Sequence, residues 1–164
     1  MKPNGLKNKT RENHEIDGLS PDANKLRDHS EIINVETLIK NIDLAWETTR
    51  TPTEFRSKLL VIFRTTLSEG SNFIQDRFLS NNEGAEAVLA QAYLMDSLIK
   101  AALETVDTKL YRAPNPTRGE QLCIIAVGGY GRGELAPFSD IDLLFLLPYK
   151  QTPRVEQVVE TILY

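Results

Sequence analysis

A run of glycines is the first feature of this 164-residue sequence that could do chemistry. Four of the six residues from 128 to 133 are glycine, and they directly follow an apolar segment. Glycine lets backbone N–H groups approach a ligand closely, which suits the oxygens of a triphosphate, and Arg132 adds a cation. The run is neither a Walker A loop, because no Gly-Lys-Ser/Thr follows, nor a dinucleotide fingerprint, because Glu134 replaces the third glycine. On its own such a run is weak evidence, because most glycine-rich turns are merely tight turns.

Two carboxylates open the next apolar segment. Asp140 and Asp142 are two residues apart, so on a strand both side chains project from the same face. Such a pair can bridge two Mg²⁺ ions, an arrangement used for in-line phosphoryl or nucleotidyl transfer. A bare Asp-x-Asp is also common as a solvated strand entrance, so this pair alone leaves both interpretations open.

The two signals are informative together. The glycine turn ends one predicted strand, the acid pair begins the next, and eleven positions separate Gly129 from Asp140. A single helical turn or tight loop, with Pro137 and Ser139 at its exit, fits this gap. We therefore expect phosphate-binding amides to lie beside metal-binding carboxylates, as a nucleotide–metal complex requires.

These residues carry a family resemblance. Gly-Gly followed at this distance by Asp-h-Asp-h, where h is apolar, resembles the signature of the DNA polymerase β-like nucleotidyltransferase superfamily. The string GGYGRGELAPFSDIDLLFL, residues 128–146, looks like the amino-terminal catalytic domain of the bacterial bifunctional uridylyltransferase/uridylyl-removing enzymes of the PII signal protein. Residues 84–96 and the helices before them are also similar to that family, so the resemblance covers roughly residues 31–164.

The resemblance implies roles for the matching residues. Asp140 and Asp142 take the catalytic and Mg²⁺-binding roles, in a two-ion site whose third carboxylate lies on a later strand. Only Glu156 and Glu160 follow in this chain, both on the final predicted helix. The residues expected to contact the nucleotide are Gly128, Gly129, Arg132 and Ser139.

One position departs from the superfamily pattern. Tyr130 stands where a serine is usual, which removes one expected hydroxyl contact to the phosphates. The tyrosine is shared with the subfamily, so the resemblance holds, but it leaves open what this side chain does.

The function implied is Mg²⁺-dependent transfer of UMP from UTP to a tyrosine of PII, in the cytoplasm. The alternatives are an adenylyltransferase of glutamine synthetase, another nucleotidyltransferase, or a non-catalytic helical interaction fragment. Because the third carboxylate is missing, we expect the chain to be an incomplete piece of the enzyme, inactive or very weak alone.

The elements that must position this site begin with helices. Apolar residues recur at helical spacing over 35–46, and Thr51-Pro52-Thr53-Glu54 predicts a capped helix start. We expect Gly70 to bend or end that helix and Asn81-Asn82 to form the next turn. The strongest pattern follows, a single apolar row: Val88, Ala92, Met95, Ile99, Ala102, Val106 and Leu110.

Beyond a proline-rich loop at 113–119 the periodicity changes. Segments 122–127 and 141–147 are short and apolar and predict strands buried on both faces, with Cys123 as a buried, inert thiol. Thr152-Pro153 predicts a final helix. The fold class expected is α+β: about three helices packed on an incomplete nucleotidyltransferase sheet with a following helix.

Composition sets the remaining limits. Residues 1–30 contain six apolar residues and predict a disordered arm, before a helical region at 31–112 and the truncated start of a nucleotidyltransferase domain at 113–164. The net charge of −4 argues against a nucleic-acid partner. No apolar run approaches the roughly 20 residues of a membrane span, and the first residues lack a signal-peptide core. His14 and His29 have no metal-ligand spacing.

Overall fold

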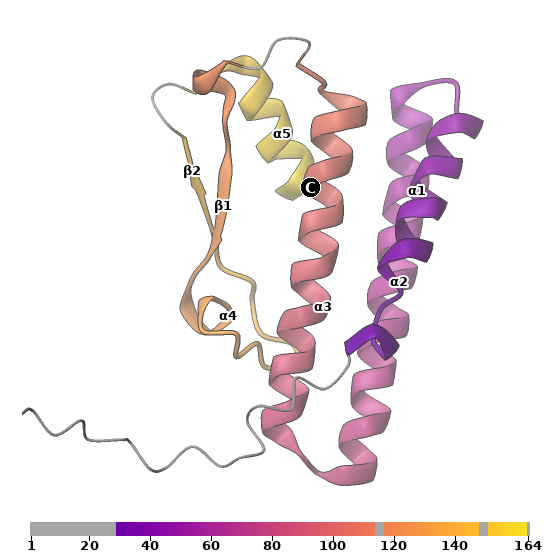
Figure 1. Ribbon diagram of the computed structural model, residues 1–164, viewed down its shortest axis with the longest axis vertical. Coiled ribbons are helices and arrows are strands. Elements are labelled where there is room, and N and C mark those ends of the chain that lie inside the picture. The colour runs from indigo at the N-terminus through magenta and orange to yellow at the C-terminus, as the bar shows by residue number, and fades with distance from the viewer. Residues whose placement is uncertain (1–28, 114–116, 148–150, 164) are drawn as a thin grey trace, which may run out of the picture.

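The computed structural model describes residues 29–113, 117–147 and 151–163 (Figure 1). A layer of helices packs beside a two-stranded antiparallel sheet, so the α+β class is confirmed. The predicted arm lies outside the described residues except for its last two positions, which begin the 3₁₀ turn η2 (His29–Glu31). Part of the predicted loop at 113–119 also lies outside them.

The first two helices begin as the sequence predicts. Helix α1 spans Val35–Thr48 and helix α2 spans Pro52–Asn81. The Thr51 side chain accepts a hydrogen bond from the Glu54 N–H at 3.2 Å, which satisfies one of the free donors of the first turn. The Glu54 carboxylate accepts in return from the Arg50 N–H at 3.1 Å, one residue before the expected position.

Gly70 does not end α2, so that part of the prediction is wrong, because the helix continues through this residue to Asn81. Gly70 is buried, and a Cβ there would lie 2.7 Å from a methyl group of Leu94 and 3.2 Å from the Ile32 carbonyl oxygen. The glycine therefore serves close packing of neighbouring segments on α2. The helix ends instead at Asn82, whose φ of 56° is left-handed, which confirms the predicted turn.

Helix α3 (Gly84–Thr105) lies in the middle of the molecule and ends in the π-helical turn η3 (Val106–Leu110) (Figure 1). In the predicted apolar row only Ala92 and Val106 are buried, and the others are half-buried. The most buried row of α3 is a different one: Ala87, Ala90, Leu94, Leu98 and Ala101. The difference arises because α3 has two apolar faces, one toward α1 and α2 and one toward the sheet.

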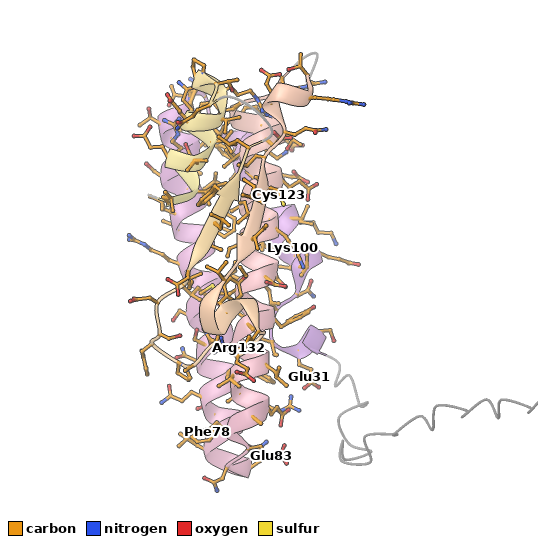
Figure 2. The ribbon with its side chains drawn as sticks, turned by 90° about the vertical axis from the view of Figure 1, so that its left-hand side faces the viewer. Glu31, Phe78, Glu83, Lys100, Cys123 and Arg132 are labelled. Carbon is orange, nitrogen blue, oxygen red and sulfur yellow. The ribbon has the colours of Figure 1, made fainter. Side chains whose placement is uncertain are left out.

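The strands β1 (Cys123–Ala126) and β2 (Leu143–Leu146) pair antiparallel, with Ala126 opposite Leu143. Their positions agree with the prediction, but burial on both faces is wrong. Alternate residues are exposed, among them Leu144 at 45%, and Cys123 is exposed rather than buried (Figure 2). The physical reason is that, among the described residues, helices cover only one face of the sheet.

The last helix, α5 (Pro153–Leu163), begins at the predicted Thr152-Pro153 and buries Val155 and Val158. It packs against the end of α3 and against η3, and the Arg154 Nε donates to the Tyr111 carbonyl at 2.6 Å. Within the described ranges, no helix combines the length and the apolar character needed to cross a membrane.

Candidate functional site

The glycine turn and the acid pair lie at the same end of the sheet. Residues Gly128–Gly131 form the short helix α4 directly after β1, and Asp142 directly precedes β2. The Val127 N–H donates to the Asp142 carbonyl oxygen at 3.0 Å, which extends the strand pairing to the start of the turn. Antiparallel pairing thus brings together two segments that the loop from 132 to 141 separates in sequence.

The two segments also lie close together at Gly128. This residue has a φ of 63°, which favours glycine, and a Cβ on it would lie 2.8 Å from the Asp142 Oδ2. At Gly131 a Cβ would lie 2.6 Å from the Ala126 carbonyl oxygen. Backbone therefore excludes a side chain at Gly131. At Gly128 a Cβ would be strained by the positive φ and would displace the Asp142 carboxylate, which rests against bare backbone. A ligand held by that carboxylate would also meet the backbone of the turn.

Tyr130 joins the turn to α3. Its side chain is buried, and its hydroxyl donates to the Asp96 Oδ1 at 2.7 Å. Burial, then the hydrogen bond to Asp96 and the charge of that carboxylate, raise the pKa of Tyr130 well above its usual range. The Tyr130 side chain therefore points toward α3, and its hydroxyl is taken up by Asp96 at a position where serine is usual.

Arg132 folds back over its own turn. The Arg132 Nη1 donates to the Gly128 carbonyl oxygen at 2.9 Å, and its Nε lies 3.4 Å from the Glu134 carboxylate. The side chain remains 68% exposed at the α4 end of the sheet (Figure 2). Because no buried contact holds it, this guanidinium is free to turn toward an anion.

Ser139 lies in a tight turn next to the acids. Its hydroxyl donates to the Ala136 carbonyl oxygen at 2.8 Å, and its N–H donates to the same oxygen at 3.1 Å. Within this turn, Phe138 has a φ of 65° and its side chain is fully exposed, and both are unusual for a bulky residue. No sequence pattern signals this conformation, so Phe138 could not have been identified from the sequence.

The carboxylates of Asp140 and Asp142 are both exposed, and within the described residues neither pairs with a cationic side chain. Two oxygen donors from alternate positions suit Mg²⁺, which usually takes one or two protein carboxylates and completes its shell with phosphates and water. The described residues contain no group of three or more His, Cys, Asp or Glu side chains placed to hold a metal ion. Both acids precede β2, which begins at Leu143, and their carboxylate oxygens are of a type that Mg²⁺ accepts.

Comparison with known proteins identifies the family. A family model described as glutamate-ammonia ligase adenylyltransferase matches residues 71–162, more than half of the chain. The chain is 50% identical over 111 residues to a bifunctional uridylyltransferase/uridylyl-removing enzyme of Azospirillum brasilense, which is 68% of this chain and 12% of that protein.

Two further relatives have the same name. The Rhodospirillum rubrum protein is 47% identical over 112 residues and the Caulobacter vibrioides protein is 46% identical over 111, each again covering 68% of this chain. The chain spans 12% of the length of these curated relatives. No solved structure matches it. The chain therefore belongs to the nucleotidyltransferase family of the glutamate-ammonia ligase adenylyltransferase model, and its relatives there include bifunctional uridylyltransferase/uridylyl-removing enzymes.

Proposed function

We propose that this chain supplies the nucleotide-binding turn and two metal ligands of an enzyme that transfers UMP from UTP to a tyrosine of the PII signal protein. The observation that carries the proposal is the contact of Gly128 with the Asp142 carboxylate. It supports a site in which phosphate-binding backbone and metal-binding oxygen meet at one point. The names of the relatives support the uridylyl group as the one transferred.

The residues divide the work between phosphate and metal. The first turn of α4 leaves the N–H groups of Gly128 and Gly129 without intrahelical partners, so they are available to phosphate oxygens. Arg132 would swing from its present acceptors to the same oxygens, and the Ser139 hydroxyl would add a donor. Asp140 and Asp142 would hold Mg²⁺, which when bound supplies positive charge against the phosphates.

The reaction is an in-line displacement at the α-phosphorus. The tyrosine hydroxyl oxygen of PII forms a bond to the α-phosphorus, and the bond to pyrophosphate breaks, so that pyrophosphate leaves with the electron pair. The tyrosine proton passes to solvent water. The fixed turn and carboxylates contribute by orienting the triphosphate before attack, which lowers the entropic part of the barrier. Donors already in place cost little reorganisation as charge shifts to the leaving group.

Replacing one metal ligand tests the proposal. In a full-length enzyme that contains this sequence, Asp142→Asn should reduce UMP transfer to background because a neutral amide binds Mg²⁺ poorly. The matched control is Asp76→Asn, which makes the same change at an exposed position on α2 and should leave transfer unchanged. Activity of Asp142→Asn within a few-fold of the parent would contradict the metal assignment.

A binding measurement addresses this chain directly. Titration with Mg²⁺ and UTP should shift the amide resonances of residues 128–142 in an NMR spectrum. Unchanged resonances in that segment would refute nucleotide binding here. We expect UMP transfer by the 164 residues alone to be absent or very weak, and a non-catalytic interaction role would be supported if neither binding nor transfer is seen.

Adenylyl transfer is the second candidate, and the description of the matching family model favours it. Nucleotide preference separates the two candidates. With Mg²⁺ present, UTP should raise the melting temperature more than ATP does. The reverse order would favour the adenylyltransferase.

A further inference from the structure

Tyr130 lies in the middle of the glycine turn but is held by a helix 34 residues earlier in the chain. Its ring is 5% exposed and packs with Ala92 of α3 and with Leu135, and its hydroxyl reaches the Asp96 carboxylate. A buried hydroxyl is costly without a hydrogen-bond partner, and the Asp96 carboxylate supplies one for Tyr130. The carboxylate of Asp96 therefore fixes where the middle of the turn sits.

Asp96 is the polar member of an otherwise apolar contact. The partly buried side chains of Met95 and Ile99 pack beside it against the turn, while its second oxygen lies 3.4 Å from the Lys100 ammonium group on the solvent side. One oxygen of Asp96 therefore accepts from the Tyr130 hydroxyl, and the other faces the Lys100 ammonium group. Asp96 is thus suited to accept a hydrogen bond in a defined direction.

A second tie holds the far end of the same segment. Leu135 is 2% exposed, and its N–H donates to the Val88 carbonyl oxygen of α3 at 3.3 Å. The other end of the segment touches the Asp142 carboxylate through Gly128. Residues 128–135 are therefore held by α3 on one side and meet the candidate metal ligand on the other.

We infer that Asp96 and Tyr130 are a positioning pair, which sets the nucleotide-binding turn relative to the candidate metal-binding carboxylates. The inference rests on the proposed function and assigns to it a residue of α3. Neither side chain touches the nucleotide. Their hydrogen bond fixes the backbone donors of Gly128 and Gly129, so its loss weakens triphosphate binding.

The test compares variants that remove or keep this hydrogen bond. Tyr130→Phe removes the donor and Asp96→Leu removes the acceptor, whereas Asp96→Asn retains an oxygen that accepts it. Binding of UTP with Mg²⁺ to the chain, measured by calorimetry, should weaken about five- to tenfold in the first two variants, as expected for one net hydrogen bond. Asp96→Asn should stay within about twofold of the parent, because the hydrogen bond is kept.

A matched control removes another tyrosine hydroxyl. Tyr111 accepts hydrogen bonds from Arg56 and, at 3.2 Å, from the Thr161 hydroxyl, at the α5 end of α3. Tyr111→Phe should leave UTP affinity unchanged. In a full-length enzyme, Tyr130→Phe should raise the KM for UTP more than it lowers kcat, a division that a general loss of stability does not produce.

Hydrogen exchange tests the positioning without any nucleotide. The N–H groups of Gly131 and Glu134 are bonded to carbonyls within the turn, and both should exchange faster in Tyr130→Phe than in the parent. Equal exchange rates in Tyr130→Phe and the parent would overturn the inference. If the parent binds UTP, equal UTP affinity of the two proteins would also overturn it. Failure of the parent itself to bind UTP would refute the proposed function, and faster exchange in Tyr130→Phe would then still establish the tie to α3.

Discussion

Helix α3 packs against α1 and α2 on one face and against the sheet and the glycine turn on the other, and the two contacts differ in kind. Toward α1 and α2 the helix presents a fully buried row of alanines and leucines, with Leu94 at 0% exposed and packed against Gly70. Toward the sheet its residues are mostly half-buried, and Asp96 offers a carboxylate to the glycine turn. The first face is held mainly by apolar packing, with an ion pair of 2.7 Å between Glu86 and Arg77 of α2 near its start. On the second face, the hydrogen bond from Tyr130 to Asp96 gives the contact a direction. One helix thus links the stability of the helical layer to the geometry of the candidate site.

The largest effect should come from truncating the helical face. Leu94→Ala leaves a void opposite Gly70 and should lower the free energy of unfolding by about 2–5 kcal/mol. Leu144→Ala makes the same change on the outer face of the sheet, where the side chain is 45% exposed, and should cost less than about 1 kcal/mol. Urea unfolding followed by circular dichroism measures both, and similar costs would show that the sheet face is as tightly packed as the helical one.

A smaller effect on stability, with a specific effect on binding, is expected at the turn. Gly128 and Gly133 both have left-handed φ angles, 63° and 74°, so alanine at either should cost roughly 1–2 kcal/mol. Only at position 128 would the new Cβ meet the Asp142 carboxylate, since nothing lies within 4 Å at position 133. Gly128→Ala should therefore weaken Mg²⁺-dependent UTP binding, measured by calorimetry, while Gly133→Ala should not. Equal binding by both variants would mean that the Asp142 contact is irrelevant to the ligand.

The smallest expected effect is a dependence of the free energy of unfolding on pH, which arises from Tyr130 on the sheet-facing side of α3. Burial and Asp96 raise the pKa of Tyr130, so the folded protein holds this proton more tightly than the unfolded chain does. The resulting stabilisation is complete below a pH of about 10, where an unfolded tyrosine ionises, and is lost as the pH rises further toward the folded pKa.

Absorbance of ionised tyrosine measures this effect. In the native state Tyr130 should remain neutral when freely accessible tyrosines titrate, and Tyr130→Phe should remove only this late step. The free energy of unfolding should also fall less steeply above a pH of about 10 in that variant. A variant that loses an ordinary step near pH 10 instead would contradict the buried, carboxylate-bound state.

Local signals made most of the secondary structure predictable. Thr51 caps α2, Asn82 ends it, and both strands lie where short apolar segments predict them. The predictions that failed concern how deeply residues are buried and which elements pack against them. Helical periodicity found an apolar row on α3 but not the deeper one, because both faces are apolar and only the packing of α1 and α2 selects between them. The strands look buried in sequence, yet their burial depends on which layers cover them.

At the candidate site, the sequence by itself determined which residue types are available and that the glycines and acids lie on neighbouring strand ends. Glycine and aspartate spacing is a local property, whereas the connection between the strands is long enough for either direction of pairing, so the antiparallel arrangement is known only from the structure. Only the tertiary structure decided that the Asp142 carboxylate lies against Gly128, and that the Tyr130 hydroxyl reaches Asp96. Those contacts join segments far apart in the chain, so they depend on how α3 and the sheet pack rather than on any local pattern.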